Sequence, residues 1–201
     1  MNARTTALAA LVLAYAAAPT HADVLVTPYI DTHVAGDVQN GRGGIGASLG
    51  YVRGPLGFEL DLERHAHFFN DADVADLVPA EGVDLNTHAT IAMASVLVPL
   101  RIRGRAGIWI PYGAAGIGLT YAVFEAFVFD AADQNNYDTS QVNLTLNVGG
   151  GVMHALSEHV RLRLDVRYFR ALVDESAHEG GYFKDYGFLR VSVGVTFAFL
   201  Q

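Results

Sequence analysis

Residues 160–169, VRLRLDVRYF, alternate apolar side chains with mostly charged ones at a period of two. Because an extended strand sends successive side chains to opposite faces, the stretch predicts a strand with one apolar face and one ionic face. The apolar face holds Val160, Leu162, Leu164, Val166 and Tyr168, and the ionic face holds Arg161, Arg163, Asp165 and Arg167. The same alternation recurs along the chain, and it decides the fold class.

Elsewhere in the chain, one face of each expected strand carries large or branched apolar side chains, as in residues 58–62, 142–148 and 189–197. The other face is small or ionic, as in Gly44, Gly46, Ser48 and Gly50. A secreted lipocalin-like barrel would instead have an apolar lumen and a charged exterior. Glycine and serine suit the narrow lumen of an eight-stranded barrel better than a surface in water. The sequence therefore favours an apolar face toward lipid and a polar face toward the lumen.

The composition is also that of a membrane protein of the β class. Of 201 residues, 51% are hydrophobic and 17% are charged, whereas soluble domains have about 25% charged residues. No uninterrupted apolar run that could span a membrane follows residue 22. The net charge of −8 argues against nucleic acid as a partner. The absence of cysteine excludes disulfides and thiolate chemistry.

The N-terminus has the pattern of a secretory signal peptide. Arg4 gives a positive start, residues 7–18 are apolar, and small residues precede a cleavage site near Ala22. The alternative is a helix that is retained as an anchor. We therefore expect a signal peptide over residues 1–22, and one barrel domain over residues 23–201.

Eight strands are expected, near residues 24–34, 42–53, 56–68, 84–100, 106–125, 140–153, 159–170 and 184–199. Long connections (35–41, 69–83, 126–139 and 171–183) alternate with short ones, as in bacterial outer-membrane barrels with short periplasmic turns. The predicted fold is all-β: an eight-stranded antiparallel up-and-down transmembrane β-barrel. The four long connections contain no lysine or arginine, and in or beside them lie Asp37, Asp71, Asp73, Asp76, Glu81, Glu125, Asp130, Asp133, Asp138, Asp174, Glu175 and Glu179.

Several motifs, taken in order, resemble the eight-stranded OmpA/OmpX-like outer-membrane barrels. The last strand is similar to their C-terminal assembly signal, at Ser192, Gly194, Phe197 and Phe199. Residues 111–118 are similar to the family's Pro-Tyr-x-x-x-Gly-x-Gly strand, and residues 148–152 and 164–168 are similar to its sixth and seventh strands. The resemblance implies a monomer in the bacterial outer membrane, inserted by the barrel assembly machinery and in contact with lipids and lipopolysaccharide. It implies little about activity.

The expected lumen contains a network of charges. The members are Glu59, Asp61 and Glu63 on one strand, Arg161, Arg163, Asp165 and Arg167 on another, and Arg190 on the last. In an eight-stranded barrel the third and seventh strands lie across the lumen from each other, so these groups can pair through the core. Buried charges cost several kcal/mol each unless they are paired. The network is expected to be a structural plug, and the alternative is a narrow path that opens when pairs exchange partners.

Histidines and two further arginines are candidates at the outer rim. His65 and His67 continue the inward register of the third strand, and His33 and His88 could approach them. Imidazole is a common metal ligand, but a solvated rim is the more ordinary role for this spacing, and no metal is assigned. Two charged residues, Arg64 and Arg170, fall among the apolar residues of the lipid-facing side. They could snorkel to the membrane surface or bind lipopolysaccharide phosphates.

The sequence gives little support to an enzyme. Ser176, His178 and Glu179 stand in a predicted loop, and their order is reversed from that of outer-membrane lipid A deacylases. A serine nucleophile needs a base within hydrogen-bond reach, and nothing in the sequence holds one there. We therefore expect a non-enzymatic protein without a cofactor, with a structural or surface-interaction role through acidic extracellular loops. The alternatives are a narrow small-solute or ion channel and, third, a lipid A-modifying enzyme.

Overall fold

The computed structural model describes residues 22–69, 83–100, 102–104, 107–128, 136–172 and 186–200. In this part of the chain no helix is long and apolar enough to span a membrane. The described residues form nine strands: β1 (Ala22–Gly36), β2 (Gly43–Arg53), β3 (Leu56–Ala66), β4 (Val83–Pro99), β5 (Ile102–Gly104), β6 (Gly107–Val128), β7 (Asn136–Ala155), β8 (Val160–Leu172) and β9 (Tyr186–Leu200).

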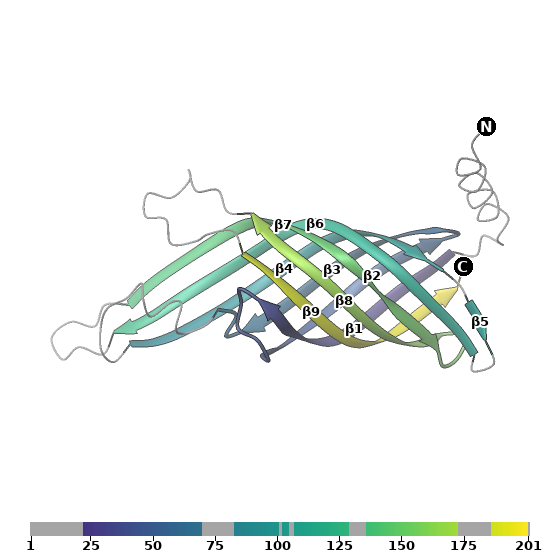
Figure 1. The fold of residues 1–201 in the computed structure, drawn as a ribbon, viewed down its shortest axis with the longest axis horizontal. Helices are drawn as coiled ribbons and strands as arrows, with labels where there is room; N and C mark the ends of the chain where they lie inside the picture. Colours follow the sequence, from purple (N-terminus) through teal and green to yellow (C-terminus); the bar gives the residue numbers. More distant parts are fainter. Residues whose placement is uncertain are drawn as a thin grey trace, which may run out of the picture.

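Eight of these strands close into a barrel (Figure 1). The order is β4-β3-β2-β1-β9-β8-β7-β6, and the pairing of β4 with β6 completes the ring. All of these pairs are antiparallel. The predicted fold is confirmed. Because the ring is closed, each strand of the barrel wall has a hydrogen-bonded neighbour on both sides.

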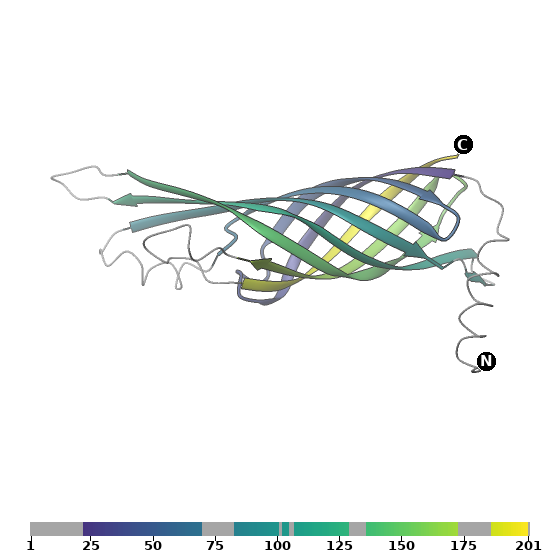
Figure 2. The same ribbon diagram turned by 90° about the horizontal axis from the view of Figure 1, so that it is seen from above.

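The strand ends differ from the predicted ones by a few residues, and two of the predicted connections change most. A short connection was expected at residues 100–105, but β5 lies there. It pairs with β6, with Ile102 opposite Trp109 and Gly104 opposite Gly107. The long connection expected at 126–139 is shorter, because β6 runs to Val128 and β7 starts at Asn136. Aromatic residues in this region favour strand. Figure 2 shows that β4, β6 and β7 project beyond the other strands, away from the C-terminus.

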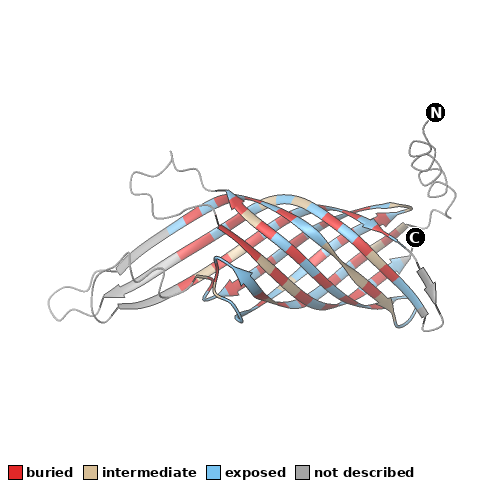
Figure 3. Cartoon of the chain, viewed as in Figure 1, coloured by how far each residue is buried: buried red, intermediate tan, exposed pale blue. Residues whose placement is uncertain are grey.

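We call the end of the barrel that holds the turns at 54–55 and 156–159 the turn end, and the opposite end the loop end. Exposed and buried residues alternate along the strands (Figure 3). In β3 the outward residues include Phe58, Leu60 and Leu62, and the inward ones include Glu59, Asp61 and Glu63. Apolar side chains therefore face outward, and charged ones face the lumen.

The inward glycines of β2 make room for side chains from both of its neighbours. Gly46 pairs with Tyr29 on β1 and with Glu63 on β3. A Cβ atom at Gly46 would lie 2.3 Å from the Tyr29 ring, well inside contact distance. The sequence predicted these glycines to face the lumen, and side chains from β1 and β3 occupy the space beside them.

Two apolar clusters close the lumen above and below its polar centre. The cluster at the turn end contains Leu25, Val52, Leu97, Ile110, Tyr112, Ala114, Met153 and Ala198. The cluster at the loop end contains Val38, Phe68, Ala89, Ile91, Met93, Phe169, Ala171, Tyr186 and Phe188. Residues 37–41 fold over this end, where the Gln39 amide donates to the Phe68 carbonyl oxygen at 2.9 Å. Sequence patterning had predicted a small and ionic lumen and had missed both clusters.

Candidate functional site

The centre of the lumen is an ionic core that links β3 to β8. Arg163 donates to Glu59 through both terminal nitrogens, with Nη2 3.1 Å from Oε1. Arg167 donates from Nη2 to the same oxygen at 2.7 Å. Glu59 and Arg167 are at most 2% exposed, so one buried carboxylate accepts from two buried guanidinium groups across the barrel. Charge-assisted bonds of this kind are stronger than neutral ones.

Asp165 completes this part of the ionic core from the same strand as the arginines. Its carboxylate lies 3.0 Å from Nε of Arg167 and 3.3 Å from Nη2 of Arg163. Tyr112 on β6 donates its hydroxyl to Asp165 at 2.5 Å. Residues two apart on a strand share a face, which explains why β8 can hold Asp165 between Arg163 and Arg167 in one inward row.

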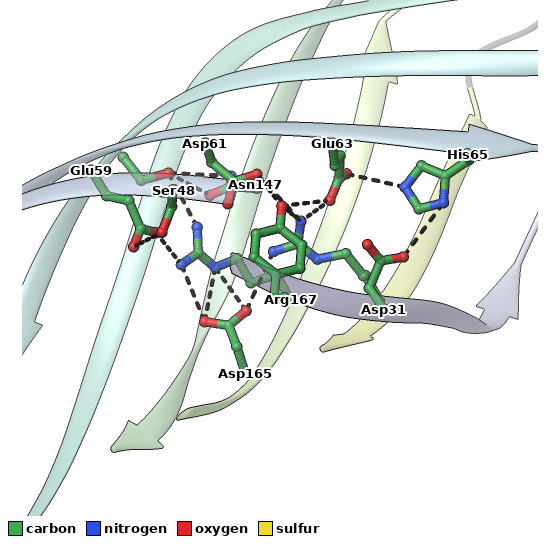
Figure 4. A network of polar contacts seen from close by, with 12 residues as sticks. Asp31, Ser48, Glu59, Asp61, Glu63, His65, Asn147, Asp165 and Arg167 are labelled. Atoms are coloured by element: carbon green, nitrogen blue, oxygen red, sulfur yellow. Dashed lines mark hydrogen bonds and ion pairs between the residues drawn. The ribbon is translucent and has the colours of Figure 1, made fainter. Parts of the chain in front are cut away.

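Arg190 on β9 extends the ionic core toward the loop end, where it meets Asp61 and Glu63 (Figure 4 labels these two carboxylates). It forms an ion pair with Glu63 and lies 3.5 Å from Asp61 Oδ1. Tyr29 donates its hydroxyl to Asp61 at 2.8 Å, and the guanidinium carbon of Arg190 lies 4.8 Å from the centre of the Phe169 ring. Carboxylate, hydroxyl and aromatic neighbours therefore surround this fully buried cation.

Arg161 lies apart from the rest of the predicted network. Its Nη2 donates to Oδ2 of Asp23 at 2.6 Å, near the turn end. The structure thus brings together seven of the eight predicted charges and places the eighth in a separate pair. Asp23 shares its inward register with Tyr29 and Asp31, two residues that the sequence analysis also missed. Counting by twos from Asp23 along β1 would have found all three.

Two of the four histidines do not lie at the solvated rim that their spacing suggested. His33 and His65 are buried, at 1% exposure each. His67 does not continue the inward register: it is exposed, with a positive φ of 53°, and the next buried residue is Phe68. The positive φ ends the alternation, because it turns the chain out of the extended conformation. His88 lies opposite Ala66, on the outward face.

The remaining candidates lie on the outside of the barrel. Arg64 faces outward on β3, opposite Ile45 and Thr90. Arg170 is partly exposed on β8 and pairs with Gly187 in register. Both arginines are near the loop end.

In the predicted assembly signal, Ser192 and Gly194 face the lumen, and Phe197 and Phe199 face outward. This strand, β9, pairs with the first strand of the barrel, β1.

Two sets of predicted residues cannot be compared with the structure. The signal peptide and its cleavage near Ala22 fall mostly in residues 1–21, which lie outside the described residues. Most of the acidic loop residues lie outside them too, as do Ser176, His178 and Glu179. Among the acidic residues, Glu125 and Asp138 are described as part of β6 and β7, where they are directly opposite each other.

The match to a family model decides the identity of this fold. Residues 6–199 match the model of the outer membrane protein beta-barrel domain, which is most of the chain. The chain belongs to this family. The resemblance that the motifs indicated is thus confirmed, and the family is one of bacterial outer-membrane proteins. No curated protein matches the chain.

Solved structures with this family's fold resemble the chain at low sequence identity. A major outer membrane protein from Thermus thermophilus has a TM-score of 0.58 and 15% identity, over 89% of this chain and 99% of that one. Neisserial surface protein A has a TM-score of 0.49 and 17% identity, over 89% and 96%. The attachment invasion locus protein Ail of Yersinia pestis has a TM-score of 0.49 and 14% identity, over 90% and 100%. These similarities concern the fold.

Proposed function

We propose that this protein is a non-enzymatic, closed outer-membrane barrel that anchors a surface-interaction region at its loop end. The observation that carries the proposal is the filling of the lumen at three successive levels. The apolar cluster at the turn end, the ionic core and the apolar cluster at the loop end follow one another along the barrel. A lumen filled in this way favours a scaffold over a path for solutes.

The surface-interaction role is proposed for the acidic long loops together with the projecting parts of β4, β6 and β7. The four long connections named above lack lysine and arginine, so they favour a partner or surface of positive charge. Cells that display the protein should adhere to a surface coated with a cationic peptide. Variants with Asp71, Asp73, Asp76 and Glu81 changed to the amides should adhere less.

Contacts with lipid and with the assembly machinery belong to the same proposal. Arg64 and Arg170 near the loop end are proposed to meet lipopolysaccharide phosphates, since guanidinium matches phosphate geometry. The outward Phe197 and Phe199 of β9 are proposed as the signal read during insertion. The signal peptide is proposed to be removed near Ala22, and the barrel to remain a monomer.

Conductance of the refolded protein in a planar bilayer tests the closed lumen. We expect no steady current from the wild type, or from Asp61→Asn and Arg163→Gln. Insertion is verified by the mobility difference between heated and unheated samples in a denaturing gel. Steady currents from the wild type that change in either variant would overturn the closed barrel and establish the small-solute channel, because the charges of the ionic core would then control ion flow.

A further inference from the structure

Three inward side chains meet between the ionic core and the apolar cluster at the loop end. Asp31 and His33 lie on β1, and His65 lies on β3 (Figure 4 shows Asp31 and His65). Gly44 of β2 stands between the two strands, in register with both Asp31 and His65. A Cβ atom at Gly44 would lie 2.3 Å from His65 Nδ1 and 2.8 Å from Asp31 Oδ1. The missing side chain of Gly44 is what allows these groups to meet.

The spacing of the three side chains suits one small cation. Asp31 Oδ1 lies 3.4 Å from His65 Nδ1, and the rings of His33 and His65 have centroids 4.3 Å apart. One ligand atom from each of the three residues lies within 4.8 Å of the others. Two ligands on a tetrahedral zinc ion are about 3.4 Å apart, given zinc–ligand distances of roughly 2.0–2.2 Å.

These polar atoms are buried without hydrogen-bond partners. Within the described part of the chain, both carboxylate oxygens of Asp31 and both ring nitrogens of His33 and of His65 have no such partner. The three residues are 6%, 1% and 1% exposed. Because buried polar groups are nearly always hydrogen-bonded, three adjacent buried residues with six unpartnered polar atoms point to a missing ligand.

The charge of the described lumen also favours a cation here. Six buried carboxylates, those of Asp23, Asp31, Glu59, Asp61, Glu63 and Asp165, are accompanied by the four buried guanidinium groups of Arg161, Arg163, Arg167 and Arg190. The excess is two negative charges, which one divalent cation would balance. Two protons would balance it as well, so binding must be measured directly.

Glu63 stands where a supporting carboxylate is expected. Its Oε1 lies 3.6 Å from His65 Nε2, the ring nitrogen that does not face Asp31. Histidines that bind metals usually donate their other ring N–H to a carboxylate, which fixes the tautomer. The edges of Phe68 and Phe188 pack on His33, with centroid distances of 5.2 and 4.7 Å, and separate the group from the loop end.

We propose that Asp31, His33 and His65 bind one divalent transition-metal ion inside the barrel, with Glu63 as the positioning residue for His65. Two imidazoles and one carboxylate suit Zn²⁺ rather than Mg²⁺ or Ca²⁺, which prefer oxygen ligands. A tetrahedral ion with three protein ligands keeps a fourth position for water. His67, the neighbour that the sequence grouped with His65, takes no part.

Titration of the refolded, metal-free mature protein with Zn²⁺ by calorimetry tests the proposal. We expect one ion per barrel, with affinity lowered more than 100-fold in His33→Gln, His65→Gln and Asp31→Asn. Glu63→Gln should lower it about 10- to 100-fold, as loss of a supporting carboxylate does. Co²⁺ in place of Zn²⁺ should give the visible absorption of a tetrahedral site.

Two matched controls separate ligand loss from loss of fold. Asp23→Asn removes a buried lumen carboxylate from the same strand at the turn end, and His159→Gln removes an exposed histidine. Both should bind Zn²⁺ within threefold of the wild-type affinity, and all variants are compared at equal folded fraction. Absence of saturable binding to the wild type, no binding by the folded controls, or wild-type affinity in the His33→Gln/His65→Gln double variant would each overturn the proposal.

Discussion

Neutralising Glu59 should destabilise the barrel strongly, because two guanidinium groups depend on this one carboxylate. Arg163 and Arg167 both donate to it, and all three side chains are at most 6% exposed. In Glu59→Gln the amide keeps the size of the side chain and one acceptor oxygen, but it removes the negative charge. Asp165 then remains as the carboxylate between the two arginines.

The expected loss is about 3–5 kcal/mol in the free energy of unfolding, the usual cost of removing one partner from a buried ion pair. Removing both partners of an ion pair should cost less free energy than removing one, because no unpaired charge then stays buried. We therefore expect Glu59→Gln and Arg163→Met to be non-additive, with a favourable coupling of roughly 2–3 kcal/mol in the double variant. The remaining Arg167 and Asp165 balance each other in that variant.

Unfolding in denaturant can be followed through Trp109, the single tryptophan of the chain. Its side chain faces outward near the turn end, with its ring 4.3 Å from that of His154, whereas the altered side chains face the lumen. Glu158→Gln, an exposed change in the turn at 156–159, is the control and should stay within about 0.5 kcal/mol of wild type. A loss below 1 kcal/mol in Glu59→Gln, or additive effects in the double variant, would refute the view that these pairs hold the lumen together.

Three further predictions test other parts of the molecule. Gly46→Ala should lower the free energy of unfolding by about 1–3 kcal/mol through overpacking, whereas Gly113→Ala, with open space around its Cβ position, should not. Arg64→Ala should weaken co-purification of lipopolysaccharide with the barrel, and an unchanged lipid content would exclude a contact there. Phe199→Ser should slow insertion by the assembly machinery in reconstituted vesicles while leaving unassisted refolding in detergent intact; equal slowing in both would indicate a folding defect instead.

The barrel wall could be predicted from the sequence because its signal is local. Alternation at a period of two, as in Leu162 to Arg167, fixes which face of a strand is apolar, and the prediction agrees with the structure. The third and seventh strands lie on opposite sides of an eight-stranded barrel, so the number of strands alone predicts that their inward side chains meet in the lumen. Local patterns therefore led both to the fold and to most of the ionic core.

The contents of the lumen ends could not be predicted in the same way. Phe68 is buried because the chain turns at His67 and folds back over the opening, and no periodic signal marks such a turn. The meeting of Asp31 with His65 depends on a glycine on a third strand, Gly44, and hence on the register of two strand pairs. Such a contact is visible only when the registers are known.

The projecting strands give the loop end a property that the closed wall lacks. In β7, residues 136–143 pair with β6, but β8 pairs with β7 only from Leu144 onward. In β4, residues 83–87 pair with β6, whereas β3 joins only from His88. In the described part of the chain, this three-stranded extension therefore has two edges without a neighbouring strand, although the Thr87 carbonyl oxygen accepts from the Phe68 amide. An extended peptide can add to such an edge through main-chain hydrogen bonds, a mode of recognition that depends on backbone geometry more than on side-chain identity.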